Sequence, residues 1–178
     1  LLKIYSLLCT YANTLPGDDF LSRHAFDFLT DSEMAALPDE EYQRFIQGFT
    51  QDHIFEIMKL SREIFGFNTL DHVAGVHFVA IHLARQFIKI GYKIDLGRVS
   101  GAAAGHDIGK YGVLKKDMPR VPYLHYYSSD VWFKKHDINY IRNIAINHST
   151  WDLEFENLSL ESLILIYSDF RVKNLEGA

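Results

Sequence analysis

A short stretch near the middle of the chain, Gly105-His106-Asp107-Ile108-Gly109-Lys110, carries the residues best suited to chemistry. It follows residues 99–104, a run of small helix-forming side chains, so the His-Asp pair is predicted to lie at a helix end. An imidazole nitrogen and a carboxylate oxygen form a mixed donor set that suits Mn²⁺, Fe²⁺, Zn²⁺ or Co²⁺. Because a single His-Asp pair occurs by chance in many chains, the other ligand candidates decide what it means.

Further side chains with metal-ligating atoms lie on central helices or near predicted helix ends: His72, His125, His148 and Asp169. His72 belongs to a predicted helix over residues 70–90 and lies on its inward apolar stripe. Asp169 follows the apolar run 163–167, so its carboxylate is predicted to be buried, and a buried carboxylate requires a cation or several hydrogen-bond donors. These residues predict a metal site, although a buried hydrogen-bonded histidine–carboxylate network would use the same side chains.

The composition is that of a folded, moderately acidic protein. The 178 residues are 48% hydrophobic and 23% charged, which fits one globular domain with a helical extension. The net charge of −5 gives no case for a nucleic-acid partner or a basic membrane-binding surface. Cys9 is the only cysteine, which excludes an internal disulfide and favours a reducing, cytoplasmic location. No apolar run is long enough for a membrane span, so no membrane partner is expected.

Apolar residues recur at helical spacing and no segment alternates like a strand, so an all-α fold is predicted. We expect residues 1–66 to form an N-terminal helical extension and residues 67–178 to form the domain that carries the ligand candidates. Helices are predicted over residues 1–15, 18–29, 30–37 and 38–66 in the extension, and over 70–90, 95–104, 128–136, 138–147 and 160–172 in the domain. The basic segment 110–120 is expected to be a loop.

The first residues already have a helical pattern, and the chain begins without methionine. We therefore expect it to be part of a longer polypeptide with other domains. The pattern leaves open whether residues 1–66 form a lid, a homodimer surface or the end of another domain.

The order and spacing of His72, the His106-Asp107 pair and Asp169 resemble the HD superfamily of metal-dependent phosphohydrolases. The resemblance covers residues 68–173. Its most specific part is residues 102–110, which are close to the family signature that ends in His-Asp-Ile-Gly-Lys. The nearest branch in signature is the HD-GYP branch, whose members hydrolyse cyclic dinucleotides, but no Gly-Tyr-Pro follows here. Branches that cleave dinucleoside polyphosphates or nucleoside monophosphates stay open.

This resemblance implies an HD-domain helical bundle and a divalent metal cofactor, either Mn, Fe, Mg, Co, Ni or Zn. One ion would be bound by the four residues of the family pattern: His72, His106, Asp107 and Asp169. Branches with two ions add histidines before the last aspartate, where His125 and His148 stand, and their doublet aspartate bridges the ions. The implied activity is hydrolysis of a nucleotide or related phosphoester by metal-activated water.

Basic side chains after the signature could meet the phosphate of such a substrate. Lys110 comes shortly after the His106-Asp107 pair, just past Gly109, and is placed to contact a phosphate oxygen. Asp107 could orient the water, so both are candidate catalytic residues. The remaining candidates for phosphate binding lie in the basic segment and on the last helix: Lys115, Lys116, Arg120 and Arg171.

Two other functions use the same residues. A di-iron oxygenase of the HD type would need iron at His125 and His148. A non-catalytic module that senses a metal or nucleotide within a larger signalling protein would need the fold alone. The basic segment favours a phosphate over an uncharged oxygenase substrate, and the complete ligand set argues against a degenerate module.

Overall fold

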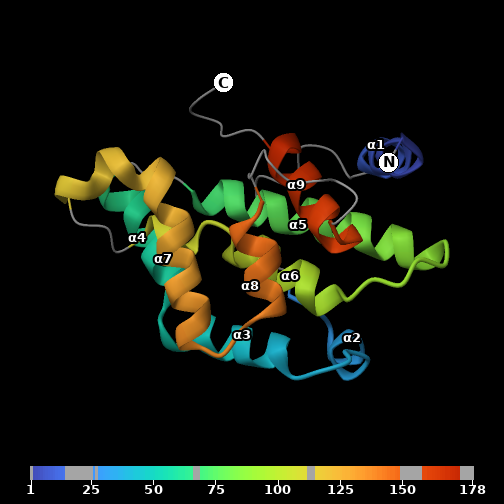
Figure 1. Cartoon of the computed structure of the whole chain (residues 1–178), viewed down its shortest axis with the longest axis horizontal. Helices are drawn as coiled ribbons and strands as arrows, with labels where there is room; N and C mark the ends of the chain where they lie inside the picture. The colour runs from blue at the N-terminus through green and yellow to red at the C-terminus, as the bar shows by residue number, and fades with distance from the viewer. Residues whose placement is uncertain are drawn as a thin grey trace.

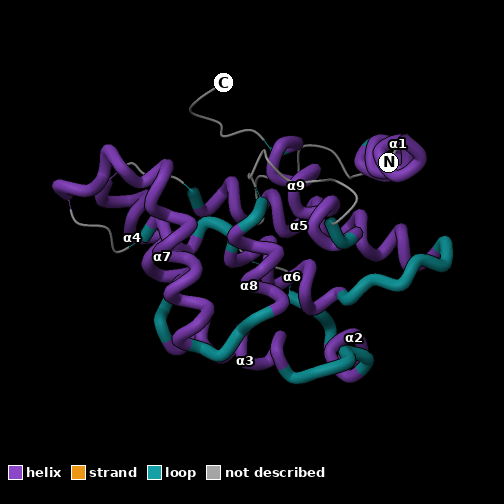
Figure 2. The backbone as a smooth tube through the Cα atoms, in the orientation of Figure 1, coloured by secondary structure: helices purple, strands orange, loops and turns teal. Residues whose placement is uncertain are grey.

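The computed structural model describes residues 2–14, 26, 28–65, 69–111, 115–148 and 158–172, and within them it contains helices and loops but no strand (Figure 2). The α-helices are α1 (Leu2–Ala12), α2 (Asp31–Ala35), α3 (Glu41–Gln51), α4 (Ile54–Phe65), α5 (Leu70–Lys89), α6 (Leu96–Gly105), α7 (Val121–Lys135), α8 (Tyr140–Ile146) and α9 (Leu160–Arg171). Two 3₁₀ turns, Ile108–Lys110 and Lys115–Arg120, separate α6 from α7. The predicted all-α fold class is confirmed.

Helix α5 is the centre of the bundle and packs against α1, α4, α6 and α9 (Figure 1). The side chains of its inward stripe are buried: Val76, Val79 and Leu83. Neighbours also cover its other faces, which explains why apolar residues occupy most sides of this helix. None of the helices in the described part of the chain combines the length and apolar character that crossing a membrane requires.

One hydrophobic core joins helices from both sides of residue 66. Leu8, Phe45 and Met58 belong to the same buried cluster as Val73 and Ile141. The division into an extension and a domain stays a prediction, because shared packing does not show whether either part folds alone. The core does show that α3 and α4 support the helices that carry the ligand candidates.

The predicted helix over residues 38–66 is in fact two helices, α3 and α4. The chain turns at His53, whose backbone φ of 52° lies in the left-handed region and ends helical geometry. Asp52 stabilises this turn by accepting hydrogen bonds from Trp132 Nε1 at 2.9 Å and from Lys135 Nζ at 2.8 Å. The predicted helix over residues 18–29 lies mostly outside the described residues, and Phe28 and Leu29 at its end are not helical.

The start of α7 also differs from the prediction. The helix begins at Val121 and not near residue 128. Pro122 does not prevent this early start, because it lies in the first turn, where a missing N–H and a fixed φ are tolerated. His125 therefore lies inside a helix and not beside its boundary. The expected loop 110–120 is partly 3₁₀, because the turn Lys115–Arg120 lies within it and the turn Ile108–Lys110 overlaps its first residue.

Helix α8 is capped by a side chain from α3. The buried carboxylate of Glu41 accepts hydrogen bonds from the backbone N–H groups of Asn139, of Tyr140 at 2.8 Å and of Ile141 at 3.0 Å. A carboxylate at a helix start satisfies free N–H groups and complements the positive end of the helix. Asp137 has a φ of 54° and precedes the helix without capping it. The end of α8, where His148 follows, is thus positioned by residues far apart in the chain.

A hydrogen-bonded chain of three side chains runs through the core beside α5. Ser100 Oγ lies 2.8 Å from His77 Nε2 and 2.8 Å from the hydroxyl of Tyr42. His77 is 1% exposed, and burial lowers its pKa to about 3. This histidine is therefore neutral in the folded protein at neutral and mildly acidic pH.

The unfolding free energy is expected to fall on acidification because the unfolded chain binds a proton at His77 that the folded protein excludes. With an unfolded pKa of 6.5 and a folded pKa of about 3, this contribution is present at pH 7 and declines as the pH drops below 6.5. The expected loss between pH 7 and pH 5 is about 2 kcal/mol from this residue. Urea unfolding at both pH values measures it. His77→Gln should reduce the pH dependence by that amount, since the two proteins differ only in this residue, and an unchanged dependence would contradict the assignment.

Candidate metal centre

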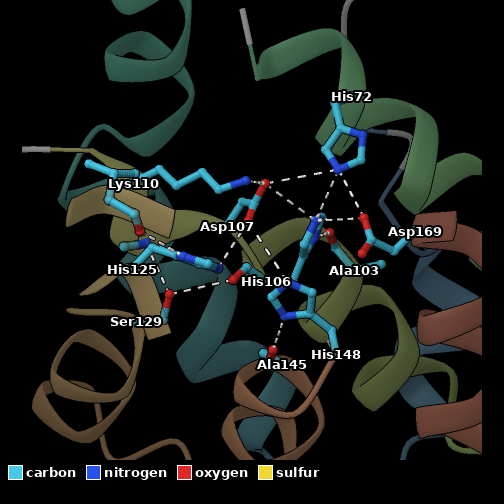
Figure 3. A network of polar contacts seen from close by, with 12 residues as sticks. His72, Ala103, His106, Asp107, Lys110, His125, Ser129, Ala145, His148 and Asp169 are labelled. Atoms are coloured by element: carbon cyan, nitrogen blue, oxygen red, sulfur yellow. Dashed lines mark hydrogen bonds and ion pairs between the residues drawn. The ribbon is translucent and has the colours of Figure 1, made fainter. Parts of the chain in front are cut away.

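Four of the predicted ligands meet where α5, α6 and α9 approach one another (Figure 3). His72 lies in the first turn of α5, His106 and Asp107 directly follow α6, and Asp169 lies near the end of α9. His72 Nε2 lies 3.0 Å from Asp169 Oδ1 and 3.4 Å from His106 Nε2. Asp107 Oδ2 lies 3.6 Å from His106 Nε2. We call His72, His106, Asp169 and Asp107 Oδ2 the first ligand group.

The other oxygen of Asp107 faces a second set of histidines. Asp107 Oδ1 lies 3.8 Å from His125 Nε2 and 3.9 Å from His148 Nε2. His125 projects from α7, and His148 lies just after α8. We call His125, His148 and Asp107 Oδ1 the second ligand group. The structure thus brings together all six residues that the sequence suggested as metal ligands.

These distances are close to those expected around a metal ion. Ligand atoms that lie about 2.0–2.2 Å from one ion lie roughly 3.0–3.5 Å from each other. In each of the triads His72–His106–Asp107 and Asp107–His125–His148, the candidate ligand atoms lie within 4.8 Å of one another. A small inward movement of the side chains would close either group around an ion.

The histidine rings are held with Nε2 toward Asp107. The Nδ1–H groups donate to backbone carbonyl oxygens of the preceding turn: His106 to Ala103 at 2.8 Å, His125 to Val121 at 2.9 Å and His148 to Ala145 at 2.5 Å. A proton on Nδ1 leaves the Nε2 lone pair free to bind a metal, and this backbone contact is the usual support of a ligating histidine. The local helical turns therefore select the tautomer that ligation requires.

The charge states also suit a metal. Burial lowers the pKa of His106 to about 4 and lowers the pKa of both His125 and His148, so these rings are neutral near pH 7. Burial acts to raise the pKa of Asp107, but its interactions with the His106 and His148 rings and with the Lys110 ammonium together outweigh burial and hold the pKa well below its usual range. The pKa of Asp169 is lowered too: burial acts to raise it, but the hydrogen bond from His72 and the nearby His106 and His148 rings together outweigh burial. Neutral imidazoles and ionised carboxylates are the forms that bind divalent ions.

Two buried atoms of the second ligand group are suited to a cation. Asp107 Oδ1 and His125 Nε2 are buried and have no hydrogen-bond partner among the residues that the structure describes. An unpaired buried carboxylate oxygen is costly, and a bound ion removes that cost. The nitrogen and oxygen donors suit a first-row divalent ion such as Mn²⁺, Fe²⁺, Co²⁺ or Zn²⁺.

Gly109 and Ser129 help to place His125, and neither role was predicted from the sequence. Gly109 N donates to Ser129 Oγ at 3.0 Å, and Ser129 Oγ donates to His106 O at 3.4 Å. A Cβ on Gly109 would lie 2.0 Å from His125 O, so only glycine lets α7 pack this closely against the His-Asp turn. The glycine inside the signature was the available signal, because a glycine beside a candidate ligand often marks a close backbone approach.

Tyr126 is a further residue of the site that was not singled out from the sequence. Its ring centroid lies 3.8 Å from that of His125 and 5.2 Å from that of His148. Burial raises the pKa of its phenol, and the charges of Asp107 and Asp169 raise it further, which keeps the phenol protonated. Tyr126 therefore covers one side of the second ligand group and brings a hydrogen-bond donor to its vicinity.

Among the predicted phosphate-binding residues whose side chains are described, Lys110 is the one that contacts a candidate ligand. Lys110 Nζ lies 2.5 Å from Asp107 Oδ2 and so enters the first ligand group. Lys116, Arg120 and Arg171 are exposed, and no hydrogen bond or ion pair with a ligand residue is found for them within the described residues. The side chain of Lys115 lies outside the described part. Their role in phosphate binding stays a prediction.

Replacing His148 by alanine is expected to lower the metal content from two divalent ions per chain to one, because the second ligand group would keep only His125 and one carboxylate oxygen. Metal analysis after equilibration with Mn²⁺ or Co²⁺ and desalting measures the stoichiometry. His53→Ala removes an exposed histidine and is the matched control, with the content of the unmodified chain expected. Two ions retained by the His148 variant would contradict this assignment.

Comparisons with known proteins did not add to this picture. Searches against protein-family models, curated proteins and solved structures found no match to the chain. The assignment of the site therefore depends on its own geometry and charge.

Proposed function

We propose that this chain is a divalent-metal-dependent phosphohydrolase or phosphodiesterase of the HD type, which acts on a nucleotide or a related phosphoester. The observation that carries the proposal is the position of Asp107, whose two oxygens face two separate histidine-containing groups. A carboxylate placed in this way could take part in holding two ions, and a pair of ions serves phosphoester hydrolysis in many enzymes.

The bound ions would supply a water of lowered pKa and neutralise the charge of the phosphate oxygens. The protein side chains have the other tasks. His72, His106 and Asp169 would hold an ion in the first ligand group, and their backbone and side-chain contacts fix their orientation. Asp107 is ionised and buried, so it can orient the attacking water through a hydrogen bond. Lys110 carries the positive charge that a phosphate oxygen needs as a partner.

The cation inside the site supports an anionic substrate over a neutral one. Lys110 is the residue of the basic segment that reaches a ligand, and an ammonium beside the metals would favour a phosphate group. An uncharged substrate of an oxygenase would gain nothing from it. The donor set alone also suits two iron ions, so the experiment below includes oxygen as a possible reactant.

A panel of phosphoesters tests the proposal. It should include nucleoside monophosphates, dinucleoside polyphosphates and cyclic dinucleotides, each incubated with chelator-treated protein that has been reloaded with Mn²⁺, Co²⁺, Mg²⁺ or Ni²⁺. We expect release of phosphate or of a nucleotide from at least one class, and loss of this release with chelator. Metal-loaded protein that hydrolyses none of them, while an Fe²⁺-loaded sample consumes oxygen with an added organic substrate, would replace the proposal by the oxygenase.

A further inference from the structure

The two oxygens of Asp107 have unequal surroundings. Oδ2, which faces the first ligand group, is contacted by Lys110 Nζ at 2.5 Å. Oδ1, which faces the second ligand group, has no hydrogen-bond partner among the described residues. Figure 3 shows the extended Lys110 side chain reaching Asp107 from the side opposite His106. An ion in the first ligand group would therefore meet a carboxylate oxygen that already has a positively charged partner.

An ammonium group and a divalent ion compete for one carboxylate oxygen. Both are cations, and at a separation of about 4 Å their repulsion disfavours binding of both to one oxygen even with partial screening. The Lys110 side chain is 24% exposed and has a flexible four-carbon stem, so it can leave without a change in the backbone. Its backbone stays fixed, since Lys110 N donates to Asp107 O at 2.9 Å within the 3₁₀ turn.

We infer that Lys110 is an internal competitor of the metal ion at Asp107 Oδ2 and weakens metal binding in the first ligand group. When the ion binds, the ammonium leaves Asp107 and becomes available to an anionic oxygen of the substrate. Since a phosphate that pairs with Lys110 also draws it away from Asp107, metal loading and phosphate binding favour each other. This inference rests on the metal centre of the proposed function, but it does not require that the bound substrate is hydrolysed.

The test measures metal affinity and not activity. Chelator-treated unmodified protein, Lys110→Met and Lys110→Arg are titrated with Mn²⁺ by calorimetry and by the electron paramagnetic resonance signal of free Mn²⁺. Methionine keeps the length of the side chain and removes its charge, whereas arginine keeps the charge. Lys93→Met controls for a general loss of charge, because it removes an exposed cation just before the other end of α6.

Lys110→Met should bind one of the two ions at least about tenfold more tightly, with the other ion nearly unchanged. Lys110→Arg and Lys93→Met should stay within about threefold of the unmodified protein. A lysine with only a structural role would not produce tighter binding when it is removed. Equal or weaker binding by Lys110→Met would overturn the inference.

The same titration separates this inference from the proposed function. If the unmodified protein binds Mn²⁺ but Lys110→Met shows no gain, competition is wrong and the metal centre stands. If Lys110→Met shows the gain but no phosphoester is hydrolysed, competition is correct and the proposed activity is wrong. If the unmodified protein and Lys110→Met both fail to bind Mn²⁺, Co²⁺ and Zn²⁺, both are overturned.

Discussion

Asp107→Asn is expected to empty both ligand groups and to lower phosphoester hydrolysis by about a thousandfold or more. Asparagine has nearly the same shape, but it lacks the negative charge that each group takes from Asp107. Metal ions contribute several kcal/mol to the stabilisation of such transition states, and each 1.36 kcal/mol corresponds to tenfold in rate. Among the described residues, Asp107 alone belongs to both groups of candidate ligands, so its substitution is the one expected to remove both ions.

Metal analysis and hydrolysis of the best substrate from the panel measure these two effects separately. Asp130→Asn is the matched control, because Asp130 also pairs with cations, at 2.6 Å from both Lys134 Nζ and Arg142 Nε, and neither of these cations belongs to a ligand group. The control should keep its metal and its rate. An Asp107 variant that keeps two ions, or hydrolyses at the rate of the unmodified chain, would remove Asp107 from the centre of the site.

Gly109→Ala is expected to have the largest effect on stability, lowering the unfolding free energy by about 3 kcal/mol or more. The added methyl group would lie 2.0 Å from His125 O and 2.5 Å from Ser129 N, which are backbone atoms of α7 and cannot rotate away. Helix α7 would have to move outward, and His125 would move with it. We therefore expect loss of the second ion together with the loss of stability.

Urea unfolding and metal analysis of the same preparations test this expectation. Gly91→Ala is an informative control, since Gly91 has a φ of 91° but open space around its Cβ position. That variant should lose about 1–2 kcal/mol from backbone conformation alone and keep both ions. If Gly109→Ala resembles Gly91→Ala in both measurements, the close packing of α7 is not what positions His125.

The candidate ligands could be chosen from the sequence because their residue types and order resemble a family pattern, and local signals predict the helices that carry several of them. The helix that carries His72 has its own apolar periodicity, and α9 has its own start signal, with Ser159 Oγ accepting from Ser162 N at 3.1 Å. Asp95 caps α6 in the same way through Arg98 N. Such signals depend on residues within one or two turns, and therefore they are readable without the fold. The all-α class follows from the same local periodicity.

The start of α7 was mispredicted because local signals there conflict. Pro119, Pro122 and the basic residues before them are typical of a loop, and only packing against the His-Asp turn shows that the helix has already begun. The roles of Gly109 and Ser129 could not be predicted either, because their hydrogen bond joins residues 20 positions apart in the chain.

The residue types and their order therefore determined which side chains could bind a metal, and local periodicity determined the helices that carry most of them. Only the tertiary structure decided that Asp107 directs its two oxygens to different histidine pairs and that Lys110 occupies one of those oxygens. The orientation of a carboxylate between two groups depends on where α5, α7 and α8 approach one turn. Those approaches are set by core packing between distant segments, which no local pattern encodes.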